Sequence, residues 1–233
     1  MRILAIDTTA NTATCALVEG GRVHGNFTID GLLTHSETML PMVDELLRHL
    51  DLSTNDVDVF AVANGPGSFT GVRIGVSTIK GLAFASGKQC VGVSSLAALA
   101  KNLEGFGGLR VPVMDARRQQ VYTAIYNNEG KCLLDDSLIP LSELADRLAA
   151  LDGDIFLAGD GYSLAERFIS GDERLKSRLK TTPAALIPHS AASVGLLAEE
   201  LFAAGKCSTD SELRPIYLRD SQAERERKEK LNK

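Results

Sequence analysis

Apolar residues follow two patterns along the first half of the chain: short continuous runs typical of buried strands, and recurrence at helical spacing. Residues 3–6 form an apolar run that ends at Asp7, and the apolar segment 12–18 leads through Gly20-Gly21 into an extended segment, 22–29. Two glycines readily adopt the positive φ angles of a tight hairpin turn, so this pattern predicts a strand and then a hairpin. The further elements predicted in this half are strands over 57–63 and 89–93 and helices over 34–50, 72–86 and 96–103.

The second half of the chain repeats this order of elements. An apolar run over 111–114 ends at Asp115 as the first run ends at Asp7, and residues 155–158 lead into Gly159 as the earlier strand leads into Gly65. The other predicted elements are a hairpin over 121–126 and 131–138 and helices over 141–151 and 190–204. We therefore expect an α/β fold of two duplicated lobes, each a mixed sheet with flanking helices.

Glycines mark the expected boundary between the lobes. Gly105, Gly107 and Gly108 fall within four residues, which is the clearest break in the pattern. We predict an N-terminal lobe over 1–106 and a C-terminal lobe over 107–219. Residues 220–233 hold four acids and five bases with Leu231 as the single large apolar residue, a composition typical of a disordered or frayed tail.

Composition restricts the class of protein. The 233 residues are 44% apolar and 24% charged, with a formal charge of −5, which is typical of a soluble globular protein. Binding nucleic acid without help requires a basic surface, so any RNA has to be held by a partner. No apolar run approaches the ~18 residues of a membrane span, and Asp7 comes too early for a signal peptide, so we expect a cytoplasmic protein without a membrane partner.

The spacing of cysteines and histidines excludes the common metal motifs. Cys15, Cys90, Cys132 and Cys207 include no Cys-x-x-Cys pair, and the four histidines include no His-x-x-x-His pair. We expect buried free thiols and no metal site in this chain.

A glycine-rich segment between a strand and a helix is the strongest local motif. Its candidate residues are Gly65, Gly67, Ser68, Thr70 and Gly71. Glycines allow another group to approach the backbone closely, and a helix start offers free N–H groups, so a phosphate cradle and a structural turn both remain open. The spacing matches neither a P-loop nor Gly-x-Ser-x-Gly, and Ser68 is therefore expected to cap the helix rather than to act as a nucleophile.

Two aspartates end corresponding strands. Asp7 is followed by Thr8, and Asp115 by an alanine and two arginines. Ligands of open α/β sheets bind at the carboxyl ends of strands, so magnesium or phosphate binding is one interpretation. The other interpretation is that both carboxylates accept hydrogen bonds from nearby backbone N–H groups. An ATPase is disfavoured because the glycine that usually follows the first aspartate is missing.

The helix over 34–50 carries an unusually wide apolar arc. On a helical wheel its apolar positions span about 160°, whereas one core needs a stripe of roughly 100°. Part of the helix can therefore face a partner, with Pro41 marking a kink or the true first turn. The helix over 72–86 carries Ser77, Gly81 and Ala85 at four-residue spacing, which allows another helix to approach closely.

Several motifs together resemble the bacterial TsaB (YeaZ) family of tRNA threonylcarbamoyladenosine biosynthesis proteins. They are Leu4-Ala5-Ile6-Asp7-Thr8, His35-Ser36-Glu37, Leu40-Pro41, the segment from Gly65 to Gly75, Met114-Asp115-Ala116-Arg117 and Pro215-Ile216-Tyr217-Leu218-Arg219. The resemblance implies an actin-like and Hsp70-like (ASKHA) fold and a non-catalytic scaffold or activator role. The complex would add a threonylcarbamoyl group to the anticodon-adjacent adenosine of tRNAs reading codons that begin with A.

The resemblance also implies partners. They are a TsaD-type catalytic subunit, which would hold the metal and the adenylate intermediate, a TsaE-type ATPase, and tRNA through the complex only. For the chain alone, a monomer and a homodimer both remain open. Ser95 and Leu99 stand where the catalytic relative has its metal-binding histidines, and neither side chain can hold that metal.

In the family the first two helices form the partner interface, which here implies Met39, Leu40, Val43, Leu47, Arg73, Ser77, Gly81 and Ala85. The alternatives are that both helices pack only on their own sheet, and that the chain is a small-molecule kinase or ATPase of the same fold.

Overall fold

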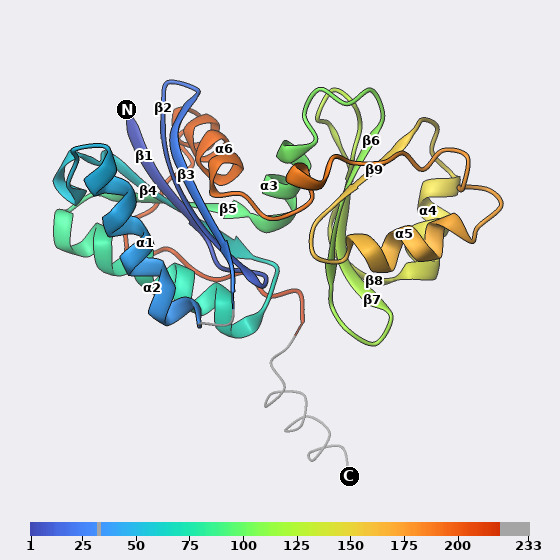
Figure 1. Ribbon diagram of the computed structural model, residues 1–233, viewed down its shortest axis with the longest axis horizontal. Coiled ribbons are helices and arrows are strands. Elements are labelled where there is room, and N and C mark those ends of the chain that lie inside the picture. The colour runs from blue at the N-terminus through green and yellow to red at the C-terminus, as the bar shows by residue number, and fades with distance from the viewer. Residues whose placement is uncertain (32–33, 220–233) are drawn as a thin grey trace, which may run out of the picture.

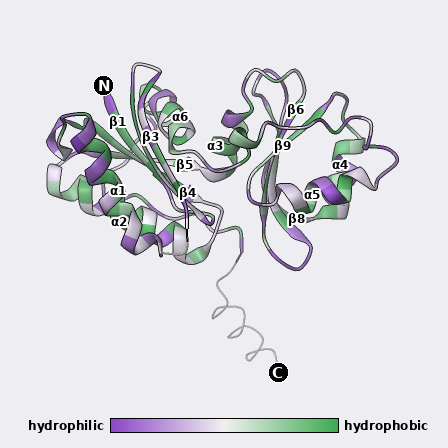
Figure 2. Cartoon of the chain, viewed as in Figure 1, coloured by the Kyte–Doolittle hydropathy of each residue, from purple (hydrophilic) through white to green (hydrophobic). Residues whose placement is uncertain are grey.

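The computed structural model describes residues 1–31 and 34–219, and it contains two β-sheets side by side (Figure 1). The tail predicted over 220–233 lies outside the described residues. Most strand positions are apolar, and polar residues concentrate in turns and on outer helix surfaces (Figure 2). Two 3-10 turns, Thr54–Asp56 and Ala184–Leu186, lie in connecting segments.

The first sheet has the strand order β3-β2-β1-β4-β5. Its strands are β1 (Arg2–Asp7), β2 (Thr12–Glu19), β3 (Arg22–Asp30), β4 (Val59–Gly65) and β5 (Gln89–Ser94). β1 pairs antiparallel with β2 and parallel with β4, so the sheet is mixed as expected. Gly20 and Gly21 adopt φ angles of 59° and 72° in the predicted hairpin turn, and the Glu199 carboxylate accepts a hydrogen bond from each of their N–H groups.

Helices α1 (His35–His49) and α2 (Phe69–Ser86) cover one face of this sheet. α1 begins at a capping box formed by Thr34 and Glu37, so Pro41 lies inside the helix and the prediction that it marks the first turn is wrong. α2 begins three residues earlier than predicted because the Ser68 hydroxyl accepts a hydrogen bond from the Gly71 N–H at 3.4 Å. The expected capping role of Ser68 is confirmed.

The second sheet has the order β8-β7-β6-β9. Its strands are β6 (Leu109–Asp115), β7 (Gln120–Tyr126), β8 (Cys132–Pro140) and β9 (Ile155–Ala158). Helices α4 (Leu141–Ala149) and α5 (Tyr162–Ser170) pack on it. We did not predict α5, although Leu164, Ala165, Phe168 and Ile169 recur at helical spacing and Ala165 and Ile169 are buried.

Two helices lie where the lobes meet. α3 (Ser95–Asn102) packs between the two sheets, on β4 and β5 of the first and on β6 and β7 of the second, while α6 (Ala191–Ala203) packs on the first sheet. Ile3 and Ala5 of β1 point to α6, whereas Leu4 and Ile6 point to α1 and α2. Although α6 falls in the range 107–219 that we assigned to the C-terminal lobe, its packing surface is the N-terminal sheet. A division into lobes by sequence position therefore does not follow the packing.

An apolar cluster also joins the two lobes directly. Its fully or almost fully buried members are Ala10, Leu96, Leu99, Leu103, Met114, Ala124 and Ala158. Cys15 and Cys90 are buried as expected, but Cys132 is exposed at the edge of the second sheet and Cys207 is half-buried, so the prediction of buried thiols is wrong for these two. No helix within residues 1–31 and 34–219 is long and apolar enough to span a bilayer.

Candidate functional site

The glycine-rich segment packs against the turn between β1 and β2. The Ser68 N–H donates to the Thr9 carbonyl at 2.7 Å, and the Thr8 hydroxyl donates to the Gly71 carbonyl at 2.7 Å. A Cβ atom on Gly71 would overlap the Thr8 carbonyl oxygen, and one on Gly67 would overlap that of Thr9. These glycines are therefore needed for contact between two segments of the chain's own backbone.

Gly65 makes room for a third segment, residues 214–219, which we call the C-terminal strap. The Ile216 N–H donates to the Asn64 carbonyl at 2.7 Å, and the Asn64 side-chain amide donates to the Arg214 carbonyl at 3.0 Å. Gly65 has a φ of 123°, and a Cβ atom there would overlap the Ile216 carbonyl oxygen. The strap thus covers the end of β4, where the glycine-rich segment begins.

Asp7 is completely buried and its carboxylate is already in use. It accepts hydrogen bonds from the Thr9 N–H at 2.8 Å and the Thr9 hydroxyl at 2.7 Å, and it pairs with His189 Nδ1 at 2.9 Å. His189 is 3% exposed and comes from the segment before α6. His189 could not be found from the sequence, because no motif or spacing connects it to Asp7 across 182 positions.

The pair is held in its charged form. Burial alone raises the pKa of Asp7, but the charge and hydrogen bond of His189 and the Thr9 donors lower it overall. Burial alone lowers the pKa of His189, but the charge and hydrogen bond of Asp7, with a smaller effect from Asp160, raise it overall. Both shifts favour a carboxylate facing an imidazolium.

Asp115 makes the corresponding turn in the second lobe. Its carboxylate accepts a hydrogen bond from the Arg117 N–H at 2.7 Å and pairs with the Arg117 guanidinium at 3.1 Å. Asp7 and Asp115 therefore both cap the N–H two residues further along, which agrees with the capping interpretation of the two aspartates.

A cleft of about 830 Å³ lies between the lobes beside this turn. Ser68, Thr70, Asp115, Arg117, Tyr217 and Arg219 are among its lining residues. The groups considered above as phosphate or magnesium ligands are engaged by the chain itself. Asp7 is sealed by His189, the glycines receive the chain's own backbone, and no cluster of three or more His, Cys, Asp and Glu side chains able to hold a metal ion occurs among the described residues.

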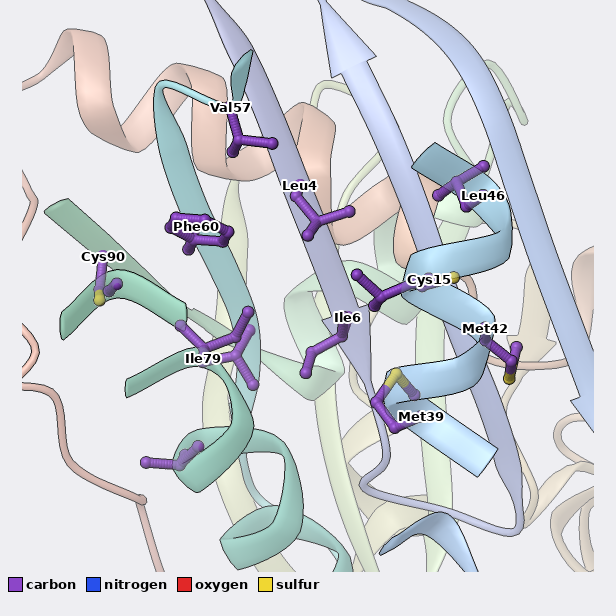
Figure 3. Close-up of a cluster of buried hydrophobic side chains, with 14 of the residues drawn as sticks. Leu4, Ile6, Cys15, Met39, Met42, Leu46, Val57, Phe60, Ile79 and Cys90 are labelled. Carbon is purple, nitrogen blue, oxygen red and sulfur yellow. The ribbon is translucent and has the colours of Figure 1, made fainter. Parts of the chain in front are cut away.

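The structure divides the interface residues expected on α1 into two groups. Met39, Val43 and Leu47 are 1%, 3% and 3% exposed and belong to the core between α1 and the first sheet. Figure 3 shows Met39 beside Ile6 and Cys15 within this core. These three side chains cannot contact a partner in this conformation, so the wide apolar arc serves mainly the chain's own core. Leu40 is the exception and is 52% exposed.

The residues expected on α2 share one exposed stripe. Arg73, Ser77, Gly81 and Ala85 are all exposed, and nothing lies within 4 Å of a Cβ atom placed on Gly81. Phe84, which the sequence analysis did not single out, is 77% exposed beside them. We call Leu40 and these five α2 residues the α1–α2 face. A groove of about 520 Å³ between the two helices includes Leu40, Arg73 and Ser77 in its lining.

The positions assigned to the catalytic relative's histidines lie inside the protein. Ser95 and Leu99 are 0% and 1% exposed, and Leu99 belongs to the apolar cluster between the lobes. Neither a hydroxyl without a neighbouring ligand nor an alkyl group can bind a transition metal.

Comparison with known proteins gives consistent matches. The family model of TsaD, tRNA N6-adenosine threonylcarbamoyltransferase, matches residues 33–227. The tRNA threonylcarbamoyladenosine biosynthesis protein TsaB of Escherichia coli (strain K12) is 31% identical over 229 residues, which cover 96% of each chain. The solved structure of YeaZ from Pseudomonas aeruginosa has a TM-score of 0.74 and 30% identity, and the match covers 93% of this chain and 99% of that one.

A more distant structure bears on the fold alone. The activator of the 2-hydroxyisocaproyl-CoA dehydratase from Clostridium difficile, solved with bound ADPNP, has a TM-score of 0.52 at 11% identity. That match covers 93% of this chain and 99% of the activator. The expected duplicated, actin-like α/β fold is confirmed.

Proposed function

This chain belongs to the TsaD family, among its TsaB (YeaZ) members, and we propose that it is a non-catalytic scaffold subunit in tRNA threonylcarbamoyladenosine biosynthesis. In this proposal a TsaD-type subunit carries the metal, the adenylate intermediate and the chemistry. A TsaE-type ATPase joins the complex in the cytoplasm, and tRNAs reading codons that begin with A are bound through the complex.

The observation that carries the non-catalytic role is the use of the site residues by the fold itself. A metal ion needs a free carboxylate, and a phosphate needs free backbone N–H groups. Here the Asp7 carboxylate accepts hydrogen bonds from Thr9 and His189, and the glycine-rich segment receives the β1–β2 turn and the C-terminal strap. We propose accordingly that this chain binds no cofactor of its own.

The α1–α2 face supports a docking role. Leu40 and Phe84 are large apolar residues that are 52% and 77% exposed. Gly81 leaves an open strip of helix backbone between the exposed residues of α2. Small residues let another helix approach closely, and exposed aromatic residues are common anchors of protein interfaces. We propose that the TsaD-type subunit binds this face, and that a second copy binds it when the chain is alone.

Reconstitution tests the proposal. The purified chain is mixed with the TsaD-type subunit from the same genome, and complex formation and tRNA modification are measured with and without it. Gly81→Arg should abolish the complex because the long side chain fills the open strip, while Glu129→Arg, in an exposed turn of the second lobe, should behave as wild type. Normal binding by Gly81→Arg would refute the interface, and full modification without this chain would refute the role.

The cleft of about 830 Å³ is large enough for a small-molecule ligand, so a small-molecule kinase or ATPase is the second candidate function. Calorimetry with ATP and magnesium distinguishes the two. The scaffold role predicts no saturable heat and no phosphate release from the isolated chain, whereas tight binding with turnover would favour the enzyme.

A further inference from the structure

Three side chains form a stack at the start of α2. The Arg73 guanidinium lies 3.9 Å from the centroid of the Phe69 ring, and the Tyr217 ring stacks on the same Phe69 ring at 4.9 Å with an interplanar angle of 29°. The Arg73 Nε–H donates to the Tyr217 hydroxyl at 2.9 Å. The guanidinium is therefore held in one orientation although Arg73 is an exposed residue.

The C-terminal strap holds Tyr217 from both sides. On one side Ile216 pairs with the Asn64 carbonyl at 2.7 Å. On the other side the Arg219 guanidinium donates to the Ala116 carbonyl at 2.7 Å and to the Gln120 side chain. The strap thus runs from the first lobe to the second. Tyr217, which contacts Arg73, lies between two anchors, one on each lobe.

The charge of Arg73 has no counter-ion among the residues that the structure describes. Other arginines on exposed helices do have one, such as Arg48 with Glu45 and Arg147 with Glu143. The hollow along this flank of α2 is lined by Arg73, Lys80 and Arg214 against a single acid, Asp210, so it is locally basic on a chain with a formal charge of −5.

We propose that Arg73 is a carboxylate-binding site on the α1–α2 face, pre-oriented by Tyr217, and that it receives an aspartate or glutamate side chain of the TsaD-type subunit. This inference rests on the proposed function. Nε of Arg73 is bound to Tyr217, and its two terminal nitrogens have no acceptor among the described residues. Their parallel N–H groups match the two oxygens of a carboxylate. Because the stack already fixes the side chain, less conformational entropy is lost on binding.

The surroundings favour a protein carboxylate over a small anion. Arg73 stands at the edge of the groove between α1 and α2, where Leu40, Phe69 and Ile74 add apolar lining. A ligand that covers this groove has to bring apolar surface together with its negative charge, as a helix of a partner subunit does. The charged group would then be shielded from water by the apolar contacts around it.

Binding measurements with the TsaD-type subunit test the proposal. Arg73→Gln should weaken the complex about tenfold to a hundredfold, because it removes an interfacial charge pair. Arg73→Lys should recover only part of the loss, because an ammonium group lacks the planar fork. Tyr217→Phe keeps the stack but loses the hydroxyl, and should weaken binding about threefold. Arg22→Gln, an exposed arginine in β3, is the matched control and should bind as wild type.

The partner's carboxylate can be found by charge exchange. Arg73→Glu should bind poorly to the wild-type subunit and regain affinity with one Asp→Lys or Glu→Lys variant in the facing helices of that subunit. The Arg73→Gln complex should also lose less affinity than wild type when the salt concentration is raised.

The outcomes separate this inference from the proposed function. If Gly81→Arg abolishes binding while Arg73→Gln and Tyr217→Phe bind as wild type, the docking face stands and the carboxylate site is refuted. If Arg73→Gln disturbs only self-association, measured by analytical ultracentrifugation, the carboxylate belongs to a second copy and the assignment to the TsaD-type subunit is refuted. If the wild-type chain does not bind the subunit, both proposals are refuted.

Discussion

Asp7 and His189 form a buried ion pair that joins β1 to the segment leading into α6. The two residues are 0% and 3% exposed. Removing one partner of a buried ion pair leaves an uncompensated charge, which costs far more than the intact pair contributes. The pair therefore gives Asp7 a structural role at the end of β1, where magnesium or phosphate binding was one interpretation of the sequence.

The pH dependence of stability should report this pair. The pKa of His189 is raised above its ordinary value of 6.5, so its contribution is complete below about pH 6.5 and is lost as the pH rises through the folded value. The pKa of Asp7 is lowered below 3.8, so its contribution is complete above that value and is lost as the pH falls through the folded value. The pair should therefore stabilise the protein most between about pH 4 and pH 6.5.

Urea unfolding of wild type and His189→Gln measures the effect. We expect the substitution to lower the free energy of unfolding by about 3 kcal/mol near pH 6, and by less near pH 9. His49→Gln, at an exposed position of α1, is the control and should change stability by less than about 0.5 kcal/mol. A loss for His189→Gln that grows between these two pH values would contradict the charged pair.

Residue roles were predictable where the signal is local. The capping of α2 by Ser68 depends on a hydroxyl and an N–H three residues apart, and it was predicted correctly. The role of Gly65 could not be decided, because the backbone that it admits belongs to Ile216, 151 positions further along. His189 carried no signal at all, since its partner Asp7 is determined only by the fold.

At the scale of elements, most strands and helices follow from the sequence. β1, β2 and β3 lie within one residue of their predicted bounds because apolar runs and a glycine pair define them. The amphipathic pattern of α1 was recognised, but its surplus apolar arc was misassigned. Met39, Val43 and Leu47 are covered by the sheet, so the pattern alone could not separate core from interface.

Two glycines of α2 should respond oppositely to the same substitution. Gly71→Ala places a methyl group on the Thr8 carbonyl and should lower the free energy of unfolding by about 2–3 kcal/mol. Gly81→Ala meets nothing within 4 Å and should raise it by about 0.5–1 kcal/mol through helix propensity. Urea unfolding followed by circular dichroism measures both. Equal midpoints for the two variants would show that the close contact with the β1–β2 turn does not constrain α2.

At the scale of the whole molecule, two helices join the lobes into one structure. α3 packs on both sheets, α6 covers the first sheet from the C-terminal half of the sequence, and the two helices contact each other. This arrangement could not be predicted from a repeat of element order, because the pattern shows which elements are amphipathic and not which sheet each one covers. Leu96, Leu99 and Met114 fill the interface between the lobes with apolar side chains, so opening it would expose apolar surface to water.

This packing predicts that the two sheets unfold together. Leu144 is completely buried in the core of the second lobe, and it belongs to neither the first core nor the cluster between the lobes. Leu144→Ala should lower the free energy of unfolding by about 2–5 kcal/mol. In native-state hydrogen exchange, the slowest amides of β1 and β4 should lose as much protection as those of β6 and β9, because one cooperative unit opens as a whole.

Leu99→Ala is the matched variant for the apolar cluster between the lobes, to which Leu99 belongs. It should lower the protection of slow amides in both sheets to the same extent. If Leu144→Ala leaves the slow amides of β1 and β4 unchanged, the lobes open independently. The interface could then part to admit a ligand, as a hinged enzyme requires. Equal losses of protection in both sheets would instead show that the α1–α2 face belongs to one rigid body. Binding at that face would then need little internal rearrangement, as expected of a subunit that acts by holding its partner.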